Sequence, residues 1–142
     1  MQPMKVLVCG AGIAGLTAAL QLHRAGHQVN LIEKSPSLRA DGYMIDFFGP
    51  GYDAAEAMGL LPELAHLHYP IGRIAFLDGS GHEQAAMSYP VVRRLLGGRH
   101  FNFMRGDLEQ QLFTHLRDVV PIRFSTSARP PRWRPYERAA RL

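Results

Sequence analysis

The spacing of apolar residues in the first third of the chain predicts a strand, a helix and a second strand. Residues 5–9 form a short apolar run that ends at a glycine, which is typical of a strand buried on both faces of a parallel sheet. In residues 13–25 polar side chains recur at intervals of three and four, the spacing of an amphipathic helix. Gly26 suits the left-handed end of that helix, and residues 28–33 are again apolar and β-branched. These segments predict a βαβ unit with a right-handed crossover.

Beyond residue 34 the pattern predicts shorter elements. The residues 78–81, Asp-Gly-Ser-Gly, are typical of a turn that joins two antiparallel strands. Asp107 and Gln110 resemble a capping box at the start of a helix that carries a leucine stripe at 108, 112 and 116. The final predicted strand should rejoin the parallel sheet. We expect strands over 43–48, 73–77, 82–87, 100–104 and 122–125, and helices over 52–58 and 107–116.

A glycine-rich segment, Gly10-Ala11-Gly12-Ile13-Ala14-Gly15, lies between the first predicted strand and helix and matches G-x-G-x-x-G. Gly10 permits a tight turn, Gly12 lets amides approach a pyrophosphate, and Gly15 lets the helix pack closely on the sheet. Glu33, at the end of the second strand, can accept hydrogen bonds from ribose hydroxyls and would repel a 2′-phosphate. The glycines alone are also compatible with a turn of no function. Their register with strand, helix and acid predicts dinucleotide binding.

Charge is unevenly distributed along the 142 residues. The formal charge is +4, and residues 128–142, with five arginines and one glutamate, carry that whole excess. Because the rest is neutral, the folded part is not expected to bind nucleic acid. Residues 128–142 show neither strand nor helix periodicity, and we expect them to be disordered. One interpretation of residues 128–142 is a functional basic tail. The other is that the sequence has left its ancestral reading frame or has been truncated.

The remaining composition limits the site chemistry. No apolar run approaches the roughly 20 residues of a membrane helix, and we expect no signal peptide. Cys9 is the single cysteine and is expected to be a small buried core residue, so a reducing, cytoplasmic setting fits best. No histidine pair has metal-ligand spacing, and His66 and His68 are expected on a solvated turn. We therefore expect no metal site and name no catalytic side chain.

Three segments together resemble one family. The strand, glycine loop and helix continue into Gly-His-Gln-Val-Asn-Leu-Ile-Glu33-Lys34; Arg39-Ala-Asp-Gly-Tyr-Met-Ile-Asp46 follows; and Phe103-Met-Arg105-Gly-Asp-Leu-Glu-Gln-Gln-Leu is an R-x-x-L-x-x-x-L segment. Over residues 4–127 the chain resembles the group A flavoprotein monooxygenases, which include p-hydroxybenzoate hydroxylase and the tetracycline-inactivating monooxygenases. The resemblance implies that the bound dinucleotide is FAD.

The resemblance also implies which residues contact the cofactor. Arg39 would meet FAD or the phosphate of incoming NAD(P)H, although a solvated loop arginine is equally compatible. Arg105 would offer a fork of donors to phosphate or ribose oxygens, and the alternative is a surface residue at a helix start. Asp46 would lie near the cofactor. The full implied set is Gly10, Ala11, Gly12, Ile13, Ala14, Gly15, Glu33, Lys34, Arg39, Asp46 and Arg105.

The fold implied is α/β: a Rossmann-like FAD/NAD(P)-binding fold of the GR2 type, with an incomplete parallel sheet and a small antiparallel hairpin insertion. Residues 1–127 would form the amino-terminal part of the FAD-binding domain, including part of a substrate-domain hairpin at about 71–104. The later Gly-Asp-Gly segment of the family is not found, so we expect a truncated chain that is inactive alone.

In the full-length family NAD(P)H drives hydroxylation of a small organic molecule, in some cases aromatic, and the sequence does not choose between NADH and NADPH. Three alternatives stay open at this point. The chain is compatible with another FAD- or NAD-dependent oxidoreductase, with a non-catalytic dinucleotide-binding fragment, or with a module whose sheet is completed by a partner chain.

Overall fold

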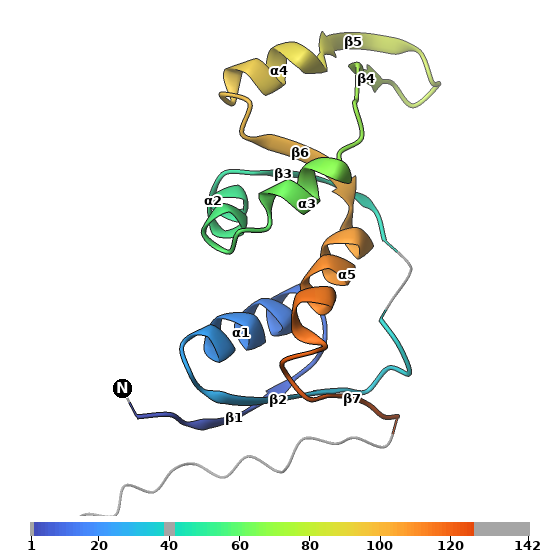
Figure 1. Cartoon of the computed structure of the whole chain (residues 1–142). Coiled ribbons are helices and arrows are strands. Elements are labelled where there is room, and N and C mark those ends of the chain that lie inside the picture. The colour runs from blue at the N-terminus through green and yellow to red at the C-terminus, as the bar shows by residue number, and fades with distance from the viewer. Residues whose placement is uncertain (1, 39–41, 127–142) are drawn as a thin grey trace, which may run out of the picture. The chain divides into compact units, whose positions relative to one another are not determined.

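The computed structural model describes residues 2–38 and 42–126 (Figure 1). Arg39 and the expected basic tail at 128–142 lie outside the described residues. The chain divides into two compact units, Met1–Leu38 with His115–Leu142, and Arg39–Thr114. The two units are described separately.

The first unit is a three-stranded parallel sheet with one crossover helix. Its elements are β1 (Lys5–Cys9), α1 (Ile13–Arg24), β2 (Gln28–Glu33) and β7 (Ile122–Phe124), and the strand order is β1-β2-β7 (Figure 1). β1 pairs with β2 from Lys5 opposite Gln28 to Cys9 opposite Ile32, and β7 returns beside β2. The predicted βαβ unit and the return of the last strand are confirmed.

Helix α1 ends and packs as its sequence pattern predicts. Leu16, Ala19 and Leu20 are buried, and α1 contacts both β1 and β2. Gly26 follows with φ of +84°, a left-handed conformation that costs glycine little because it has no Cβ. Its amide donates to the carbonyl of His23 over 2.9 Å, so the end of the helix is closed by a backbone hydrogen bond.

Only one face of this sheet is covered by the described part of the first unit. Val29 and Leu31 point to the α1 side and are buried, whereas Leu7, which points to the other side, is 44% exposed. Cys9 lies on the same uncovered face and is exposed. The expectations of a doubly buried strand and of a buried cysteine were wrong, because an apolar run in a strand is compatible with a sheet covered on one face.

The second unit contains two antiparallel strand pairs. β3 (Met44–Phe48) pairs with β6 (His100–Met104), and β4 (Arg73–Leu77) pairs with β5 (Glu83–Ser88) around the predicted turn. Two helices, α3 (Leu61–His66) and α4 (Tyr89–Leu95), were not predicted, because six or seven residues with a proline near the start show too little periodicity. The elements are β3 (Met44–Phe48), α2 (Pro50–Ala57), α3 (Leu61–His66), β4 (Arg73–Leu77), β5 (Glu83–Ser88), α4 (Tyr89–Leu95), β6 (His100–Met104) and α5 (Arg105–Leu116), of which the last two residues belong to the first unit.

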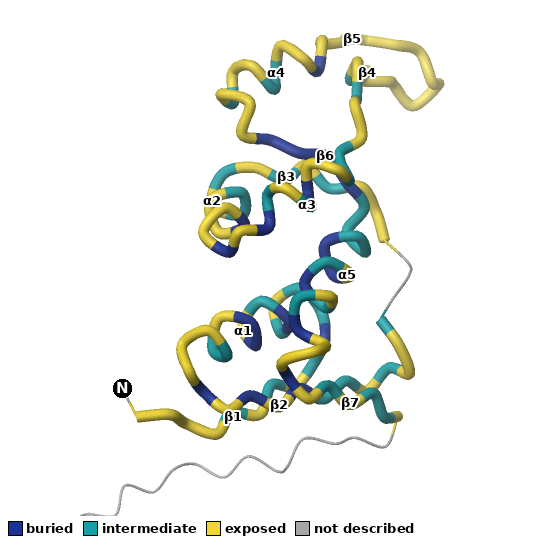
Figure 2. The backbone as a smooth tube through the Cα atoms, in the orientation of Figure 1, coloured by how far each residue is buried: buried dark blue, intermediate teal, exposed yellow. Residues whose placement is uncertain are grey.

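The core of the second unit follows β6, and the β4–β5 hairpin is open. Residues 100–103 of β6 are all buried, whereas Phe76 and Leu77 of β4 are 50% and 62% exposed (Figure 2). Within residues 2–38 and 42–126, no helix combines the length and the apolar character needed to cross a membrane.

Helix α5 keeps its predicted leucine stripe but begins earlier than expected. Leu108, Leu112 and Leu116 are buried. The helix begins at Arg105, whose amide donates to the carbonyl of Tyr43 over 3.0 Å. The capping box predicted at Asp107 was wrong, because this residue lies inside the first turn and not before it.

Candidate dinucleotide-binding site

The loop between β1 and α1 has the tight geometry that its glycines predict. Gly10 has φ of +109°, and its amide donates to the carbonyl of Ile32 over 2.7 Å, which ties the loop to β2. A Cβ built on Gly15 would lie 1.9 Å from the carbonyl oxygen of Gly10, closer than real Cβ contacts come. The third glycine is therefore required for α1 to start this close to the end of β1.

The amino terminus of α1 has the features of an anion site. Gly12 is the N-cap residue with an extended backbone, φ −75° and ψ 176°, and no described side chain caps the helix. The first turn carries no acidic side chain. Amides at the start of a helix have no intrahelical acceptor, and the helix dipole places partial positive charge there. A phosphate is the chemical group that such amides bind best.

Glu33, at the tip of β2, is fixed against this loop. Its Oε2 accepts the Ala11 amide over 2.6 Å, and its Oε1 accepts the Ser35 amide over 2.8 Å. The hydrogen bond from Ala11, followed by that from Ser35, lowers the pKa of Glu33 below its ordinary value. The carboxylate is therefore ionised at neutral pH, and the Ser35 hydroxyl and the Lys34 amide act on its pKa in the same direction. Lys34, the next residue, is exposed.

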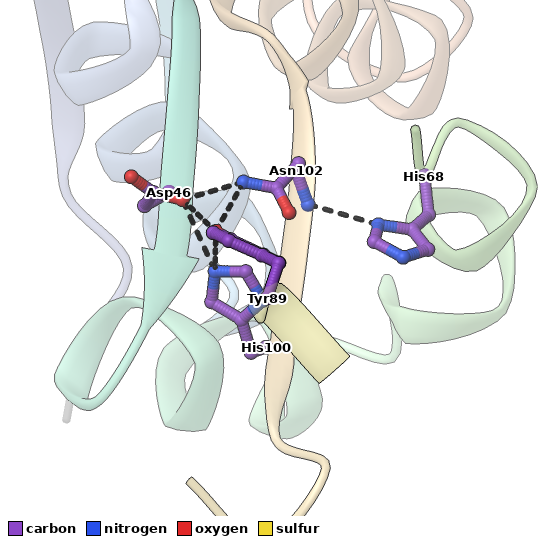
Figure 3. Close-up of polar contacts among 5 residues, drawn as sticks. All are labelled: Asp46, His68, Tyr89, His100 and Asn102. Carbon is purple, nitrogen blue, oxygen red and sulfur yellow. Dashed lines mark hydrogen bonds and ion pairs between the residues drawn. The ribbon is translucent and has the colours of Figure 1, made fainter. Parts of the chain in front are cut away.

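A second polar site surrounds Asp46 in the other unit (Figure 3). Asp46 on β3 lies opposite Asn102 on β6, and His100 lies two residues earlier on β6. The hydroxyl of Tyr89, the first residue of α4, reaches the same place. His100, Asn102 and Tyr89 are buried, whereas the side chain of Asp46 is 58% exposed. We call Tyr89, His100 and Asn102 the Asp46 cradle.

The hydrogen bonds of the cradle converge on one oxygen of Asp46. Its Oδ1 accepts from the Tyr89 hydroxyl and from Nδ2 of Asn102, and Nε2 of His100 lies 3.3 Å away. The Tyr89 oxygen in turn accepts Nδ2 of Asn102 over 2.7 Å and lies 2.9 Å from Nε2 of His100. Because the Tyr89 hydrogen is directed to Asp46, Nε2 must carry the hydrogen of this His100 contact.

These contacts also set the ionisation of the site. Partial burial alone would raise the pKa of Asp46, but the hydrogen bonds from Tyr89, Asn102 and His100 outweigh it and lower that pKa. Burial, together with the bond to Asp46, raises the pKa of Tyr89 to about 12. At neutral pH Asp46 is therefore a carboxylate, and Tyr89 keeps the proton that it donates.

His68 and His66, expected together on a solvated turn, occupy different places. His66 is the exposed last residue of α3. His68 is only partly exposed: its Nδ1 accepts the Asn102 amide over 3.0 Å (Figure 3), and its ring contacts Phe101. The expectation for His68 was wrong, because the segment after α3 runs alongside β6, where the Tyr69 amide also donates to the Asn102 carbonyl. Burial lowers the pKa of His68.

Arg105 has a partner within its own helix. Its Nη2 lies 2.6 Å from Oε1 of Glu109, one turn later, and Glu109 is only 3% exposed. The side chain of Arg105 is itself 29% exposed, so part of its donor fork is accessible. Its contact with a cofactor stays a prediction.

The predicted cofactor residues fall into separate groups. In the first unit the structure brings together the loop from Gly10 to Gly15 and Glu33. Asp46 and Arg105 belong to the second unit. Arg39 lies outside the described residues. Sequence reasoning missed the cradle. The available signal was the alternation in His-Phe-Asn-Phe, which places two polar side chains of β6 on one face.

A strand, a glycine loop, an uncapped helix and a fixed strand-end carboxylate define a dinucleotide-binding protein of the α/β class. Comparison with known proteins narrows the class. The FAD binding domain family matches residues 5–55. The chain is 32% identical over 126 residues to the flavin-dependent monooxygenase eupH from Phoma sp, covering 87% of this chain and 29% of the relative. A flavin-dependent monooxygenase from Legionella longbeachae is 32% identical over 127 residues, with 87% and 31% covered.

Solved structures agree with these relatives. The crystal structure of tetracycline destructase Tet(55) matches with a TM-score of 0.69 at 27% identity, covering 89% of this chain and 30% of that one. Tetracycline destructase Tet(51) matches with a TM-score of 0.67 at 28% identity. Residues 5–55 thus match an FAD binding domain, and 87% of the chain is similar to flavin-dependent monooxygenases. The chain spans about 30% of the length of the relatives it matches.

Proposed function

We propose that the first unit holds the adenosine diphosphate half of FAD, as part of a flavin-dependent monooxygenase. The observation that carries this proposal is the contact between Gly15 and Gly10, which no residue with a Cβ permits and which brings the start of α1 to the end of β1. This approach leaves the amides of residues 12–14 at an uncapped helix start. A diphosphate satisfies those amides and the helix dipole together.

The acid beside this loop fits the sugar of the same ligand. Glu33 is ionised and is fixed beside the loop by the amides of Ala11 and Ser35, so its charged oxygens are placed to accept hydrogen bonds from the 2′- and 3′-hydroxyls of the adenosine ribose. A 2′-phosphate would place like charges together. The unit should therefore prefer an unphosphorylated ribose, as in FAD, over the phosphorylated ribose of NADPH.

The whole protein is proposed to hydroxylate a small organic substrate, with aromatic compounds as the first class to test and NAD(P)H as the reductant. FAD supplies the redox chemistry when it is bound, and this chain supplies binding and orientation. Asp46 and Arg105 are proposed as further cofactor contacts from the second unit, and Arg39 as another. The relatives are about three times as long, so hydroxylase turnover by the 142-residue chain alone should be negligible.

Calorimetric titration of the full chain tests this function. ADP should bind, and 2′-phospho-ADP, which keeps the 5′-diphosphate, should bind at least about tenfold more weakly, because bringing two like charges together costs on the order of 1.4 kcal/mol. Glu33→Gln should narrow that difference. Glu83→Gln is the matched control, since Glu83 is an exposed partner of Arg73 on the hairpin. Equal affinity for the two nucleotides, or no binding of ADP, would contradict the proposal.

A second function is favoured by one observation on the same unit. The sheet face opposite α1 exposes Leu7 and Cys9. A groove on this face is lined by Leu7, Asn30 and Arg123, among others. Parallel sheets are normally covered on both faces. A partner chain that completes this layer would make the protein a module of a larger assembly. The test is co-expression with a polypeptide that corresponds to the part of the relatives that this chain does not cover. Size-exclusion chromatography then distinguishes a stable complex from an independent chain.

A further inference from the structure

The Asp46 cradle contains buried polar atoms whose arrangement does not serve stability. Among the described residues, Nδ1 of His100 and Oδ1 of Asn102 are buried without a hydrogen-bond partner. A buried acceptor left without a partner costs about 1–3 kcal/mol. Turning the Asn102 amide over would not relieve this cost, because its oxygen would then face the Asp46 carboxylate. The Asn102 oxygen therefore stays unsatisfied so that both Asn102 hydrogens reach Asp46 and Tyr89, and Nδ1 of His100 stays unsatisfied while its Nε2 faces the same two groups.

The result is a carboxylate with two unlike oxygens. Oδ1 faces the three cradle side chains, whereas no described group hydrogen-bonds Oδ2, which points away from them in Figure 3. The Asp46 side chain is 58% exposed although its three partners are buried. If the Asp46 carboxylate served only to join β3 and α4, both of its oxygens would be expected to accept hydrogen bonds from the cradle side chains.

We infer that Tyr89, His100 and Asn102 are positioning residues that hold Asp46 so that its Oδ2 accepts a hydrogen bond from an O–H or N–H donor of a bound ligand. This inference rests on the proposed function. Two ligands carry such a donor: the flavin half of FAD, through its hydroxyls and its N–H, and a phenolic substrate, through its hydroxyl. The residues act through Asp46 and do not touch the ligand themselves.

The ionisation of Asp46 gives the inference a signature. Tyr89 from α4 and His100 from β6 are the titratable groups that face Asp46, and His68 contacts the far side of Asn102. Removing the Tyr89 hydroxyl withdraws a donor to the charged form, so the pKa of Asp46 rises towards its ordinary value. Ligand binding that needs the carboxylate is lost as pH falls through this pKa. In Tyr89→Phe that loss must begin at a higher pH than in the wild-type chain.

The test uses the full 142-residue chain with riboflavin and phenol as separate probes, and ADP as a probe of the first unit. Asp46→Asn keeps an oxygen for the cradle but replaces the outward acceptor with an NH2 donor. Whichever of riboflavin and phenol the wild-type chain binds, Asp46→Asn should lower its affinity by about tenfold or more. The variant should also remove the pH dependence of that affinity below pH 5. Tyr89→Phe should weaken the same probe and shift its pH midpoint upward. Tyr43→Phe, at a side chain that is 68% exposed, is the matched control.

Each outcome decides the inference. Loss of riboflavin binding in Asp46→Asn and Tyr89→Phe supports it with the cofactor as donor, and loss of phenol binding supports it with the substrate as donor. It is overturned if the wild-type chain binds neither probe, if both variants behave like Tyr43→Phe, or if Tyr89→Phe lowers affinity by one factor at every pH, as a merely structural residue would. Failure of the proposed function is distinguished from failure of this inference, because it appears as an absence of ADP binding in the wild-type chain.

Discussion

Replacing Gly15 with alanine sets two known effects against each other. Gly15 lies inside α1, where alanine is preferred over glycine by about 1 kcal/mol because it loses less backbone entropy. Against this, the new Cβ would lie 1.9 Å from the Gly10 carbonyl oxygen and 3.0 Å from its carbon. The obstacle is backbone and not the end of a flexible side chain. The separation must grow from 1.9 Å to at least 3.0 Å, so the start of α1 must move away from β1.

The balance should therefore be unfavourable. Overpacking a tight contact costs roughly 1–3 kcal/mol, and a contact with backbone belongs at the upper end. After subtraction of the gain in helix propensity, the free energy of unfolding should fall by about 2 kcal/mol, and Tm by roughly 5–10 °C. Because the displaced amides are those proposed to bind phosphate, affinity for ADP should fall at least about tenfold as well.

Circular dichroism melting and calorimetric titration with ADP measure the two effects on one sample. Gly79→Ala is the control, since a Cβ there meets nothing within 4 Å and the backbone is not left-handed. The reasoning is refuted if Gly15→Ala melts at or above the wild-type temperature and binds ADP with unchanged affinity. Such a result would mean that the helix and strand separate freely and that the third glycine has no structural role.

Three further predictions concern single sites. The pKa of Glu33 is lower in the folded chain than in the unfolded chain. Its contribution to stability is therefore present above the unfolded pKa and is lost as pH falls through the folded pKa. Because Gln does not titrate, Glu33→Gln should flatten the decline of Tm between about pH 5 and pH 3. Arg105→Met leaves the buried Glu109 without its ion-pair partner and should cost about 3 kcal/mol in thermal unfolding, whereas adding Glu109→Gln should restore most of it. Leu7→Lys, on the uncovered sheet face, should raise the soluble yield in expression trials with little change in Tm. Unchanged profiles, an Arg105→Met chain as stable as wild type, or equal yields would contradict them in turn.

Local patterns in the sequence were sufficient to predict the first unit. The glycine spacing, the helix periodicity and the acid at the end of the second strand are each determined by neighbours in the chain, and their positions follow from βαβ geometry. The link from Ala11 to Glu33 was not predicted, because it depends on the rotamer of one side chain. The exposed face was also missed, since apolarity in a short strand does not reveal how many layers cover it.

The second site could be predicted only in part. Asp46 was identified through resemblance, but the cradle joins residues 43 to 56 positions apart from Asp46, and no local pattern specifies such contacts. Tyr89 reaches the site because α4, a helix too short to predict, begins at that residue. Arg105 was predicted to face a cofactor, and its ion pair with Glu109 follows from an i, i+4 spacing that the sequence already contained.

The central claim is that phosphates rest on the amides at the start of α1. Two-dimensional 1H–15N NMR of the full chain during titration with ADP tests it residue by residue. The account predicts that the largest shifts occur at the amides of Gly12, Ile13 and Ala14, with smaller shifts near Glu33. ADP that leaves these amides unchanged, or that shifts only residues of the second unit, would contradict it.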